Sequence, residues 1–267
     1  MPQMADMQDR TALITGSGTG LGRSLAIKLA ERGADVIINY SRSAGDAKET
    51  AEQCREFGVE VQVVKADVSE KTGCQALAKA AFAWGKLDIL INNAGITRHA
   101  SKHSDLDALS KDDFMDTYAV NVVGPFLMMQ ACKPLLVSSY EESGRASSVL
   151  NTSSIAGVAG IGSSVAYAAS KGALNTMTFS LARALAPQIR VNSVCPGFIG
   201  TRWFRERMDE EKFKKVEARV RETTPLQVAS GPDDIADAAL FFVSDAARHV
   251  TGELLIVDGG RHLGFGR

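Results

Sequence analysis

Short apolar runs alternate along the chain with longer segments in which apolar residues recur every three or four positions. Seven apolar runs predict strands, at residues 10–15, 35–39, 59–65, 86–91, 147–152, 190–194 and 253–257. The periodic segments between them predict helices, at residues 21–32, 44–57, 70–83, 111–136, 164–184 and 232–244. Because strand and helix alternate without a repeat or a linker, we expect an α/β protein with a doubly wound parallel sheet of about seven strands and helices on both faces.

The boundaries of these elements carry further expectations. Ser69 is the expected N-cap of the helix 70–83, since its hydroxyl can accept a hydrogen bond from the first turn. Pro125 and Pro134 are expected to kink or end parts of the helix 111–136. With no composition shift along the sequence, we expect residues 1–267 to form a single domain.

A glycine-rich turn joins the first predicted strand to the first helix, as Thr15-Gly16-Ser17-Gly18-Thr19-Gly20-Leu21-Gly22. Glycines let the backbone approach a pyrophosphate closely, and the helix N-terminus offers free N–H groups and the positive end of a dipole. Strand, glycine turn, helix and strand together form the nucleotide-binding unit of a Rossmann-type fold. The phosphate-binding residues expected in this turn are Gly16, Thr19, Gly20, Leu21 and Gly22.

A tyrosine and a lysine lie on one face of the predicted helix 164–184. Tyr167 and Lys171 are four residues apart, so their side chains stack one above the other. A cation beside a phenol favours the phenolate, and we therefore expect Lys171 to lower the pKa of Tyr167 toward the working pH of an acid/base catalyst. The Ser154 hydroxyl could bond the same substrate oxygen, and Ser153 is the alternative. Taken alone, this pair also occurs on helices without a catalytic role.

Six motifs, in order, resemble those of the short-chain dehydrogenase/reductase family. They are Thr15-Gly16-x-x-x-Gly20-x-Gly22, Asn92-Asn93-Ala94-Gly95, Asn121, Ser154, Tyr167-x-x-x-Lys171 and Pro196-Gly197. The resemblance covers about residues 9–260, and its C-terminal part is similar to the 3-oxoacyl-[acyl-carrier-protein] reductase-like branch, at residues 223–226, 232–236, 250–252 and 257–260. It implies an oxidoreductase that interconverts a ketone, with a 3-oxoacyl thioester as one candidate, and a secondary alcohol.

The resemblance also implies a role for each catalytic position. Tyr167 would give a proton to the carbonyl oxygen during reduction and remove the alcohol proton in the reverse direction. Lys171 would lower the pKa of Tyr167 and hold the hydroxyls of the nicotinamide ribose. Ser154 would fix the substrate oxygen, and thirteen residues before the tyrosine is the family spacing. Asn121 would hold a water that links Lys171 to solvent.

Further coenzyme contacts follow from the same resemblance. The adenine would be framed by Asp67 and Val68, and the adenosine ribose would lie over Asn93, Ala94 and Gly95. The nicotinamide end would be bounded by Pro196 and Gly197, and its carboxamide would be held by Thr201 with the backbone near Ile199. Tyr167 and Lys171 complete this coenzyme site.

The choice of coenzyme turns on the end of the second predicted strand. NAD sites of this fold place an acidic residue there, whereas NADP sites place a cation for the 2′-phosphate. The chain reads Tyr40-Ser41-Arg42-Ser43, with no acid before Asp46. Arg42 can bond a phosphate bidentately, although it could also be a solvated loop charge. We therefore expect NADP and regard NAD as the less favoured coenzyme, noting that Thr19 stands where many NADP-preferring members carry a basic residue.

The segment at about 198–230 is the substrate lid of relatives. Trp203 and Phe204 could cover an apolar substrate, and the cations that follow could meet a phosphate-bearing carrier. The alternative is a solvated amphipathic helix with Trp203 packed in the core. His99 and His103 lie four residues apart in a polar loop. We interpret them as surface or substrate-rim residues and expect no metal site.

Composition restricts the partners and the location. The 267 residues include 30 basic and 31 acidic ones, a balance that argues against nucleic acid or an acidic membrane surface. The four cysteines are widely spaced, as in reduced cytoplasmic proteins. Residues 146–170 carry no charge but are too rich in Ser, Thr, Asn and Gly to span a membrane, and residues 1–10 do not form a signal peptide. Relatives pair the helices that carry Asn121 and Tyr167, so a homotetramer is expected.

Two other functions remain open at this point. A dinucleotide-binding sensor or scaffold without turnover would need the glycine turn but no acid at Tyr167. An NAD-dependent alcohol dehydrogenase of the same fold would differ only in its coenzyme. We do not expect an extended-type epimerase or dehydratase of the same superfamily, because those need a larger C-terminal substrate domain than the residues after the strand 190–194.

Overall fold

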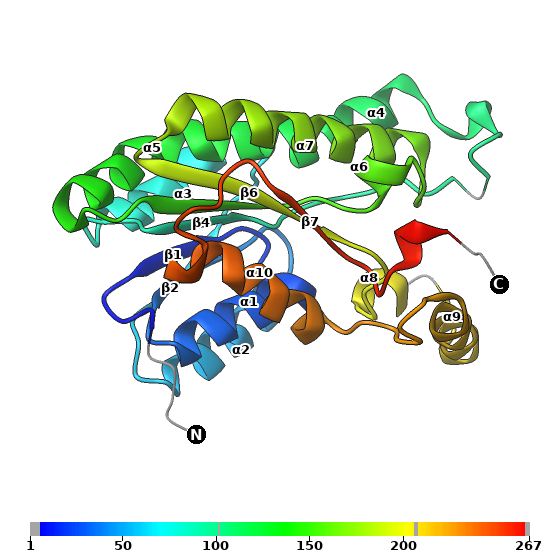
Figure 1. The fold of residues 1–267 in the computed structure, drawn as a ribbon, viewed down its shortest axis with the longest axis horizontal. Coiled ribbons are helices and arrows are strands. Elements are labelled where there is room, and N and C mark those ends of the chain that lie inside the picture. Colours follow the sequence, from blue (N-terminus) through cyan, green and yellow to red (C-terminus); the bar gives the residue numbers. More distant parts are fainter. Residues whose placement is uncertain (1–5, 101, 206–207, 265–267) are drawn as a thin grey trace.

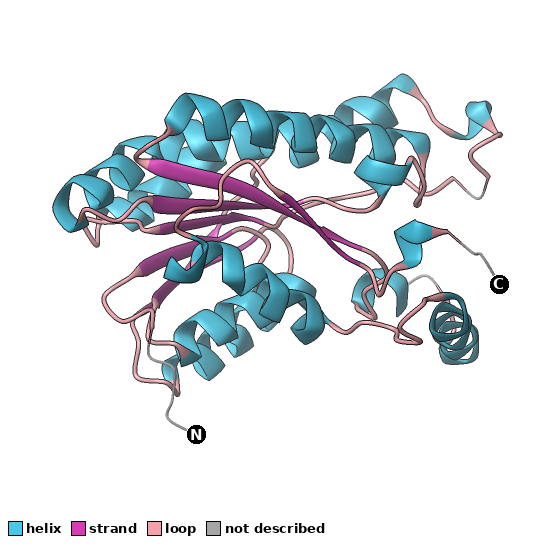
Figure 2. Ribbon diagram, in the orientation of Figure 1, coloured by secondary structure: helices cyan, strands magenta, loops and turns pink. Residues whose placement is uncertain are grey.

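The computed structural model describes residues 6–100, 102–205 and 208–264. Within these residues, seven strands form one parallel sheet in the order β3-β2-β1-β4-β5-β6-β7 (Figures 1 and 2). The strands are β1 Thr11–Ile14, β2 Asp35–Tyr40, β3 Val61–Lys65, β4 Ile89–Asn92, β5 Ser147–Thr152, β6 Ile189–Pro196 and β7 Leu254–Val257. The predicted doubly wound parallel sheet is confirmed.

Helices cover both faces of the sheet, as predicted. One face carries α1 Gly20–Glu31, α2 Ala44–Arg55 and α10 Pro232–Val243 (Figure 1). The other face carries α3 Lys71–Phe82, α4 Lys111–Tyr118, α5 Gly124–Ser143, α6 Ala156–Ala159 and α7 Val165–Leu185. Two further helices, the short α8 Arg202–Arg205 and the longer α9 Glu210–Thr223, lie at the end of the sheet where β7 ends (Figure 1).

The central strands are buried along almost their whole length because both of their faces are covered. In β1, Ala12 and Ile14 point into the core on the α1 side, and Leu13 points into the core on the α3 side. Leu13 lies in register with Ile37 of β2 and Leu90 of β4. Continuous burial of this kind is typical of parallel strands, and it explains why these runs show no polar alternation in the sequence.

The strand order places the chemistry at one edge of the sheet. The order reverses between β1 and β4, and ligands of open α/β sheets bind outside the carboxyl ends of the strands at this point. The glycine turn 15–22 follows β1, and Asn93-Ala94-Gly95 follows β4. Two motifs that are far apart in the sequence therefore flank the same crevice.

Three predicted boundaries are wrong. Ser69 does not cap α3, because its backbone N–H and its hydroxyl both donate to Asp67 Oδ1 and the helix begins at Lys71 after Glu70. The predicted helix 111–136 is interrupted by a π-helical turn, Ala119–Val123, and α5 then continues to Ser143. The expected break at Pro125 is confirmed, since α5 begins at Gly124 directly after the π-helical turn and Pro125 lies in its first turn, whereas Pro134 lies inside the helix without ending it.

One helical stretch of the described residues, Lys111–Ser143, is long and apolar enough to cross a membrane. Met128, Cys132 and Leu136 of this stretch are buried in the core that α3, α5 and the sheet share. This stretch is therefore a core helix of the fold.

Candidate active site

The glycine turn after β1 has the geometry of a phosphate cradle. Gly16 and Gly20 adopt positive φ angles of 62° and 57°, which favour glycine. A side chain on Gly22 would overlap the Gly16 carbonyl oxygen. The α1 helix begins at Gly20 without a side-chain cap from Thr19 and without an acid in its first turn. Uncapped N–H groups at a helix start suit an anion, so this turn fits the phosphates of a dinucleotide.

The Thr15 hydroxyl connects the glycine turn to the end of β4. It accepts hydrogen bonds from the backbone N–H groups of Asn93 and Ala94, at 2.9 and 3.0 Å. The Asn93 side chain in turn donates to the carbonyl oxygens of Thr15 and Gly16, at 3.0 and 3.1 Å. The two predicted coenzyme motifs are thus held as one unit.

The end of β2 presents a basic residue near the start of α2. Tyr40 is half-buried, and Ser41 and Arg42 are exposed. Arg23, the other cation near the turn, forms an ion pair with Glu49 of α2 at 2.6 Å. Arg42 therefore remains the cation in the position predicted for a 2′-phosphate.

Gly95 connects the coenzyme motifs to the predicted catalytic residues. A Cβ atom on Gly95 would lie 3.4 Å from Asn121 Oδ1 and 3.6 Å from Lys171 Nζ. On the opposite side, Val68 of the predicted adenine pair is buried and packs against Gly124 at the start of α5. Asp67 lies beside it at the end of β3, bonded to Ser69.

Asn121 lies in the π-helical turn, fully buried. Its Oδ1 atom accepts from the Ile96 N–H, and its Nδ2 group donates to the Ile96 carbonyl and to the Ser170 hydroxyl, at 2.9, 2.9 and 3.0 Å. These bonds tie the loop after β4 to α7. Single π-helical turns inside α-helices are frequent at functional sites, because the extra residue redirects side chains and backbone groups.

Tyr167, Lys171 and Ser154 come together at the carboxyl end of β5. Ser164 caps α7 by accepting from the Tyr167 N–H at 3.1 Å, which fixes the start of the helix that carries both side chains. Lys171 Nζ donates to the Thr152 carbonyl at 2.7 Å and lies 5.7 Å from the centre of the Tyr167 ring. The Ser154 side chain lies close enough to the Tyr167 phenol to lower the pKa of that group.

The geometry favours Ser154 over Ser153 as the partner of the substrate oxygen. The Ser153 hydroxyl is buried and donates to the Lys171 carbonyl at 3.2 Å, so its proton is already bonded to the backbone of α7. The Ser154 side chain is only half-buried and lies at the phenol.

The expected lowering of the Tyr167 pKa by Lys171 is wrong for this structure. Burial raises the pKa of Tyr167 to about 12, against the opposing effect of the Ser154 side chain. Burial likewise lowers the pKa of Lys171 to about 8. The reason is that the loss of water on burial is the largest effect on both groups; the ammonium group donates to the Thr152 carbonyl and lies over the ring.

The nicotinamide end of the predicted site is formed by the turn after β6. The Gly197 N–H donates to the Val257 carbonyl at 3.0 Å, and a side chain on Gly197 would come within 2.6 Å of Asp258 Cβ. The Pro196 carbonyl accepts from the Ile155 N–H at 3.0 Å, which joins this turn to the residue after Ser154. Further along, the Thr201 N–H donates to the Ile199 carbonyl at 2.7 Å.

For the segment 198–230, the contacts favour the prediction that its aromatic side chains cover the substrate. They weaken the prediction that its cations meet a carrier phosphate. The Trp203 ring lies 6.3 Å from the Tyr167 ring, centre to centre, so it covers the predicted acid rather than packing in the main core. The side chain of Phe204 lies outside the described residues. On α9, Lys215 and Arg221 form ion pairs with Glu211 and Glu217 of the same helix, which leaves less charge to meet a carrier phosphate.

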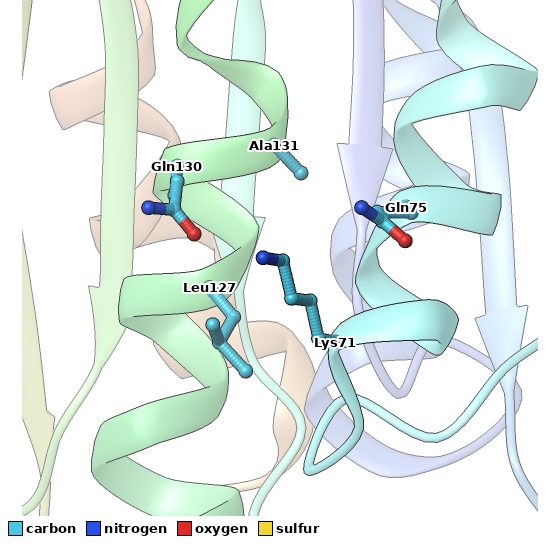
Figure 3. A pocket seen from close by; sticks show the side chains of 5 residues that line it. All are labelled: Lys71, Gln75, Leu127, Gln130 and Ala131. Atoms are coloured by element: carbon cyan, nitrogen blue, oxygen red, sulfur yellow. The ribbon is translucent and has the colours of Figure 1, made fainter.

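Other candidate positions do not form a site. His103 Nε2 lies 3.0 Å from the Gly162 carbonyl, and His99 is exposed. In the described part of the chain, no three His, Cys, Asp or Glu side chains are placed to hold a metal ion. A hollow of about 250 Å³ lies between α3 and α5, away from every predicted site residue; it is lined by Lys71, Gln75, Leu127, Gln130 and Ala131 (Figure 3).

Two contributors to the site were not predicted. The Thr152 carbonyl holds Lys171, and a backbone group leaves no signal in the residue type. Asp46, which comes too late in the sequence to meet the ribose, forms an ion pair with Arg202 instead. No local pattern connects two residues that are 156 positions apart.

Comparison with known proteins identifies the family. A family model described as enoyl-(acyl carrier protein) reductase matches residues 16–262. The chain is 39% identical to a Streptomyces violaceoruber protein assigned as ketoacyl reductase 2 of the granaticin polyketide synthase, over 94% of this chain and 96% of that protein. It is 36% identical to the L-rhamnose 1-dehydrogenase (NAD(P)(+)) of a Sphingomonas strain, over 96% and 98%.

Comparison with solved structures indicates the same family. A Burkholderia xenovorans protein assigned as a short-chain dehydrogenase/reductase superposes with a TM-score of 0.87 at 38% identity, over 96% of this chain and 98% of that one. The chain is a short-chain dehydrogenase/reductase. The RhlG/NADP active-site complex of Pseudomonas aeruginosa, another structure similar to this short-chain dehydrogenase/reductase, has a TM-score of 0.87 at 30% identity, over 98% and 100%.

The protein is accordingly an oxidoreductase that acts on alcohols and ketones. The short-chain dehydrogenase/reductase family uses NAD or NADP, and the glycine turn and the β4 end of this member fit such a dinucleotide. When bound, the coenzyme supplies or accepts the hydride. The side chains of the protein then have two tasks: they position the carbonyl group of the substrate, and they donate or accept the proton.

Buried Lys171 gives this dehydrogenase a testable dependence of stability on pH. Its folded pKa of about 8 lies below the ordinary value of 10.5, so the unfolded chain binds the extra proton more tightly between these values. Lys171 should therefore contribute to the free energy of unfolding an increase of about 1 kcal/mol per pH unit from pH 8 to 10, and Lys171→Met should lose this contribution. The buried thiols of Cys54, Cys74 and Cys132, whose pKa values are raised, act in the opposite direction in both proteins, so the effect is measured as the difference between the two. Above pH 10, Tyr167 acts in the opposite direction, since its pKa is raised.

Urea unfolding of the wild type and of Lys171→Met at several pH values between 8 and 10 measures this effect. Lys133→Met, which removes an exposed lysine of α5, is the matched control and should follow the wild type. Parallel stability curves for the wild type and Lys171→Met would contradict the depressed pKa.

Proposed function

We propose that the protein is an NADP-dependent short-chain dehydrogenase/reductase that interconverts a ketone and a secondary alcohol, with Tyr167 as its acid/base. The observation that carries this proposal is the meeting of Tyr167, Ser154 and Lys171 beside Gly95. Proton donor, hydroxyl partner and cation thereby lie next to the crevice where the two coenzyme motifs are joined.

Each catalytic side chain has a part in the proposed reaction. Because burial keeps the Tyr167 phenol protonated at neutral pH, it can donate its proton to a carbonyl oxygen. Ser154 bonds the same oxygen and holds it in line with the phenol. Lys171, which the Thr152 carbonyl holds in place, binds the nicotinamide ribose. Asn121 keeps the loop after β4 against α7 and holds the water through which the proton is replaced.

Preference for NADP is proposed from the end of β2. Tyr40, Ser41 and Arg42 follow one another there, and Arg42 is exposed for a 2′-phosphate. Asp46, the first acid after this run, already neutralises Arg202 and is thus unlike the ribose-binding acid of an NAD site. A relative with bound NADP and another that is named for both coenzymes are compatible with this choice.

The remaining coenzyme contacts are proposed from the positions of the motifs. The adenine lies between Asp67 and Val68 at the end of β3. The adenosine ribose packs on the segment that Thr15 holds, residues 93–95. The nicotinamide end lies at the turn after β6, bounded by Pro196, Gly197, Ile199 and Thr201.

For the substrate we propose a carbonyl compound with an apolar body, such as a 3-oxoacyl thioester, under a lid formed by residues 198–230. Trp203 lies over Tyr167, and Val158 and Ile161 are exposed apolar side chains in the segment just before α7. In this proposal residues 1–267 form a single domain, because the lid is attached to the end of the sheet and is not a separate unit.

A panel of ketones tests this function. 3-Oxoacyl thioesters, steroids, sugars and small diketones are mixed with the protein and NADPH, and the loss of NADPH absorbance is followed. We expect the thioesters to be reduced fastest. Binding of NADPH without consumption by any member of the panel would instead favour a sensor or scaffold, and consumption of NADH alone would favour an NAD-dependent enzyme.

We propose a cytoplasmic homotetramer as the working assembly. Large apolar side chains stand exposed on the helices that relatives pair, among them Met115 of α4, Phe126 of α5 and Phe179 of α7. Their burial against a second copy would remove this apolar area from water. Sedimentation equilibrium gives the mass, and a monomer at micromolar concentration would contradict the assembly.

A further inference from the structure

An arginine of the segment 198–230 forms an ion pair with the coenzyme-binding half of the protein. Arg202 donates from Nη1 to Asp46 Oδ2 at 2.9 Å and from Nη2 to Asp46 Oδ1 at 2.7 Å. Asp46 lies in the first turn of α2, four residues after Arg42. The bond is bidentate, which is the strongest form of an arginine–carboxylate pair and the most specific in direction.

The neighbouring residue extends this contact to α1. The Thr201 methyl group lies 3.5 Å from the position that a Cβ atom would occupy on Gly20, the first residue of α1. The starts of α1 and α2 lie close together, since a Cβ atom on Gly18 would be 3.1 Å from Ser43 Oγ. Residues 201 and 202 therefore form a strap that reaches both helix starts bordering the proposed coenzyme crevice.

The segment behind the strap can move as one body. Phe198, Phe213 and Val220 form a hydrophobic cluster of their own, separate from the two cores that flank the sheet. Two backbone hydrogen bonds anchor the segment on the β7 side: the Gly200 N–H donates to the Ser230 carbonyl at 2.9 Å, and the Leu226 N–H donates to the Gly259 carbonyl at 3.1 Å. A unit with its own core pivots about such an anchored side more readily than it unfolds.

We propose that Asp46 and Arg202 form a latch that holds the segment 198–230 closed over the coenzyme crevice and thereby sets the rates at which NADP enters and leaves. This inference rests on the proposed function, and it assigns a role to a carboxylate that the reaction does not use. The latch joins the lid to the helix that follows the proposed 2′-phosphate residues, so opening it uncovers that end of the crevice.

The latch is weak enough to open in each catalytic cycle. The Arg202 side chain is 53% exposed and that of Asp46 is 22% exposed, so water and salt screen their attraction. The Arg202 hydrogen bond holds the pKa of Asp46 below its usual range, which keeps the pair charged at neutral pH. For an exposed pair, breaking the contact should change the opening equilibrium by about two- to fivefold.

Stopped-flow binding of NADPH to four proteins tests the latch: wild type, Asp46→Asn, Arg202→Met and the double variant. The association and dissociation rate constants should both rise by about two- to fivefold in each single variant, with the dissociation constant changed less than twofold. The double variant should match the single ones, since one contact cannot be lost twice. Added NaCl should speed release from the wild type more than from the variants.

Asp237→Asn is the matched control. It breaks the 2.7 Å ion pair between Lys28 of α1 and Asp237 of α10, which does not involve the strap, and it should leave both rates unchanged. Unchanged rates in both latch variants would overturn the proposal. So would a raised dissociation constant in Arg202→Met alone, which would mean that Arg202 binds the coenzyme directly.

A second measurement does not depend on coenzyme. The chain has two tryptophans, so Trp84→Phe leaves Trp203, beside the strap, as the single fluorophore. In that background, Asp46→Asn should increase quenching of Trp203 by acrylamide, and Asp237→Asn should not. Failure of the wild type to bind NADPH would refute the proposed function. Equal acrylamide quenching in Trp84→Phe with and without Asp46→Asn would refute the latch.

Discussion

Tyr167→Phe should lower the turnover of a ketone by about 10²–10⁴-fold while NADPH still binds. The substitution removes one oxygen atom and keeps the ring that Trp203 covers, so the shape of the site is preserved. The loss comes from the missing proton donor, which Ser154 cannot replace because an ordinary serine hydroxyl is a much weaker acid. Single-turnover reduction under saturating NADPH measures the chemical step, and quenching of protein fluorescence measures coenzyme binding.

Tyr140→Phe is the control for this variant. Tyr140 lies near the end of α5, away from the carboxyl edge of the sheet, and loses the same atom. It should retain wild-type turnover. If Tyr167→Phe also turned over the ketone at the wild-type rate, Tyr167 would not be the acid, and the chain would need another proton donor at the crevice.

Arg42→Glu should reverse the coenzyme preference. A hydrogen bond to a charged group contributes about 1.5–3 kcal/mol, and the new carboxylate adds repulsion from a 2′-phosphate. The KM for NADPH should therefore rise by at least about 100-fold, whereas the KM for NADH should change little or fall. Initial rates with both coenzymes and one good ketone give the two ratios.

Arg55→Glu makes the same charge change at the other end of α2. The Arg55 side chain donates to the Val61 carbonyl there, so it lies at the start of β3 rather than at its carboxyl end. Its KM values should stay within about twofold of the wild type, because its distance from the crevice exceeds the screening length of physiological salt. A selectivity that stays the same in Arg42→Glu would remove Arg42 from the 2′-phosphate site.

Features set by the local sequence were predictable. The fully buried strand Thr11–Ile14, the glycine turn behind it and the capped helix of Tyr167 each depend on residues that are neighbours in the chain. Periodicity and turn chemistry report such features directly. The spacing of Tyr167 and Lys171 likewise placed both side chains on one helix face, and the structure brings them together with Ser154.

Features set by the tertiary environment were not predictable. The spacing of Tyr167 and Lys171 predicted that the two side chains are close, but it did not predict how deeply they are buried. Burial raises the pKa of Tyr167, whereas the sequence had indicated a lower pKa. Pro134 reads as a helix breaker, yet packing of α5 on the sheet keeps its helix intact. Pro125 predicted an interruption near Asn121, but the residue types do not distinguish a π-helical turn from a simple kink.

The separate cluster of Phe198, Phe213 and Val220 has an evolutionary consequence. Substitutions inside it are absorbed locally, since these side chains share no packing with the two cores of the sheet. Insertions or wholesale exchange of this region should leave folding of the rest intact. One inherited redox scaffold can in this way diversify toward chemically unrelated molecules by replacing a single module of about thirty residues, counted as the stretch 198–230.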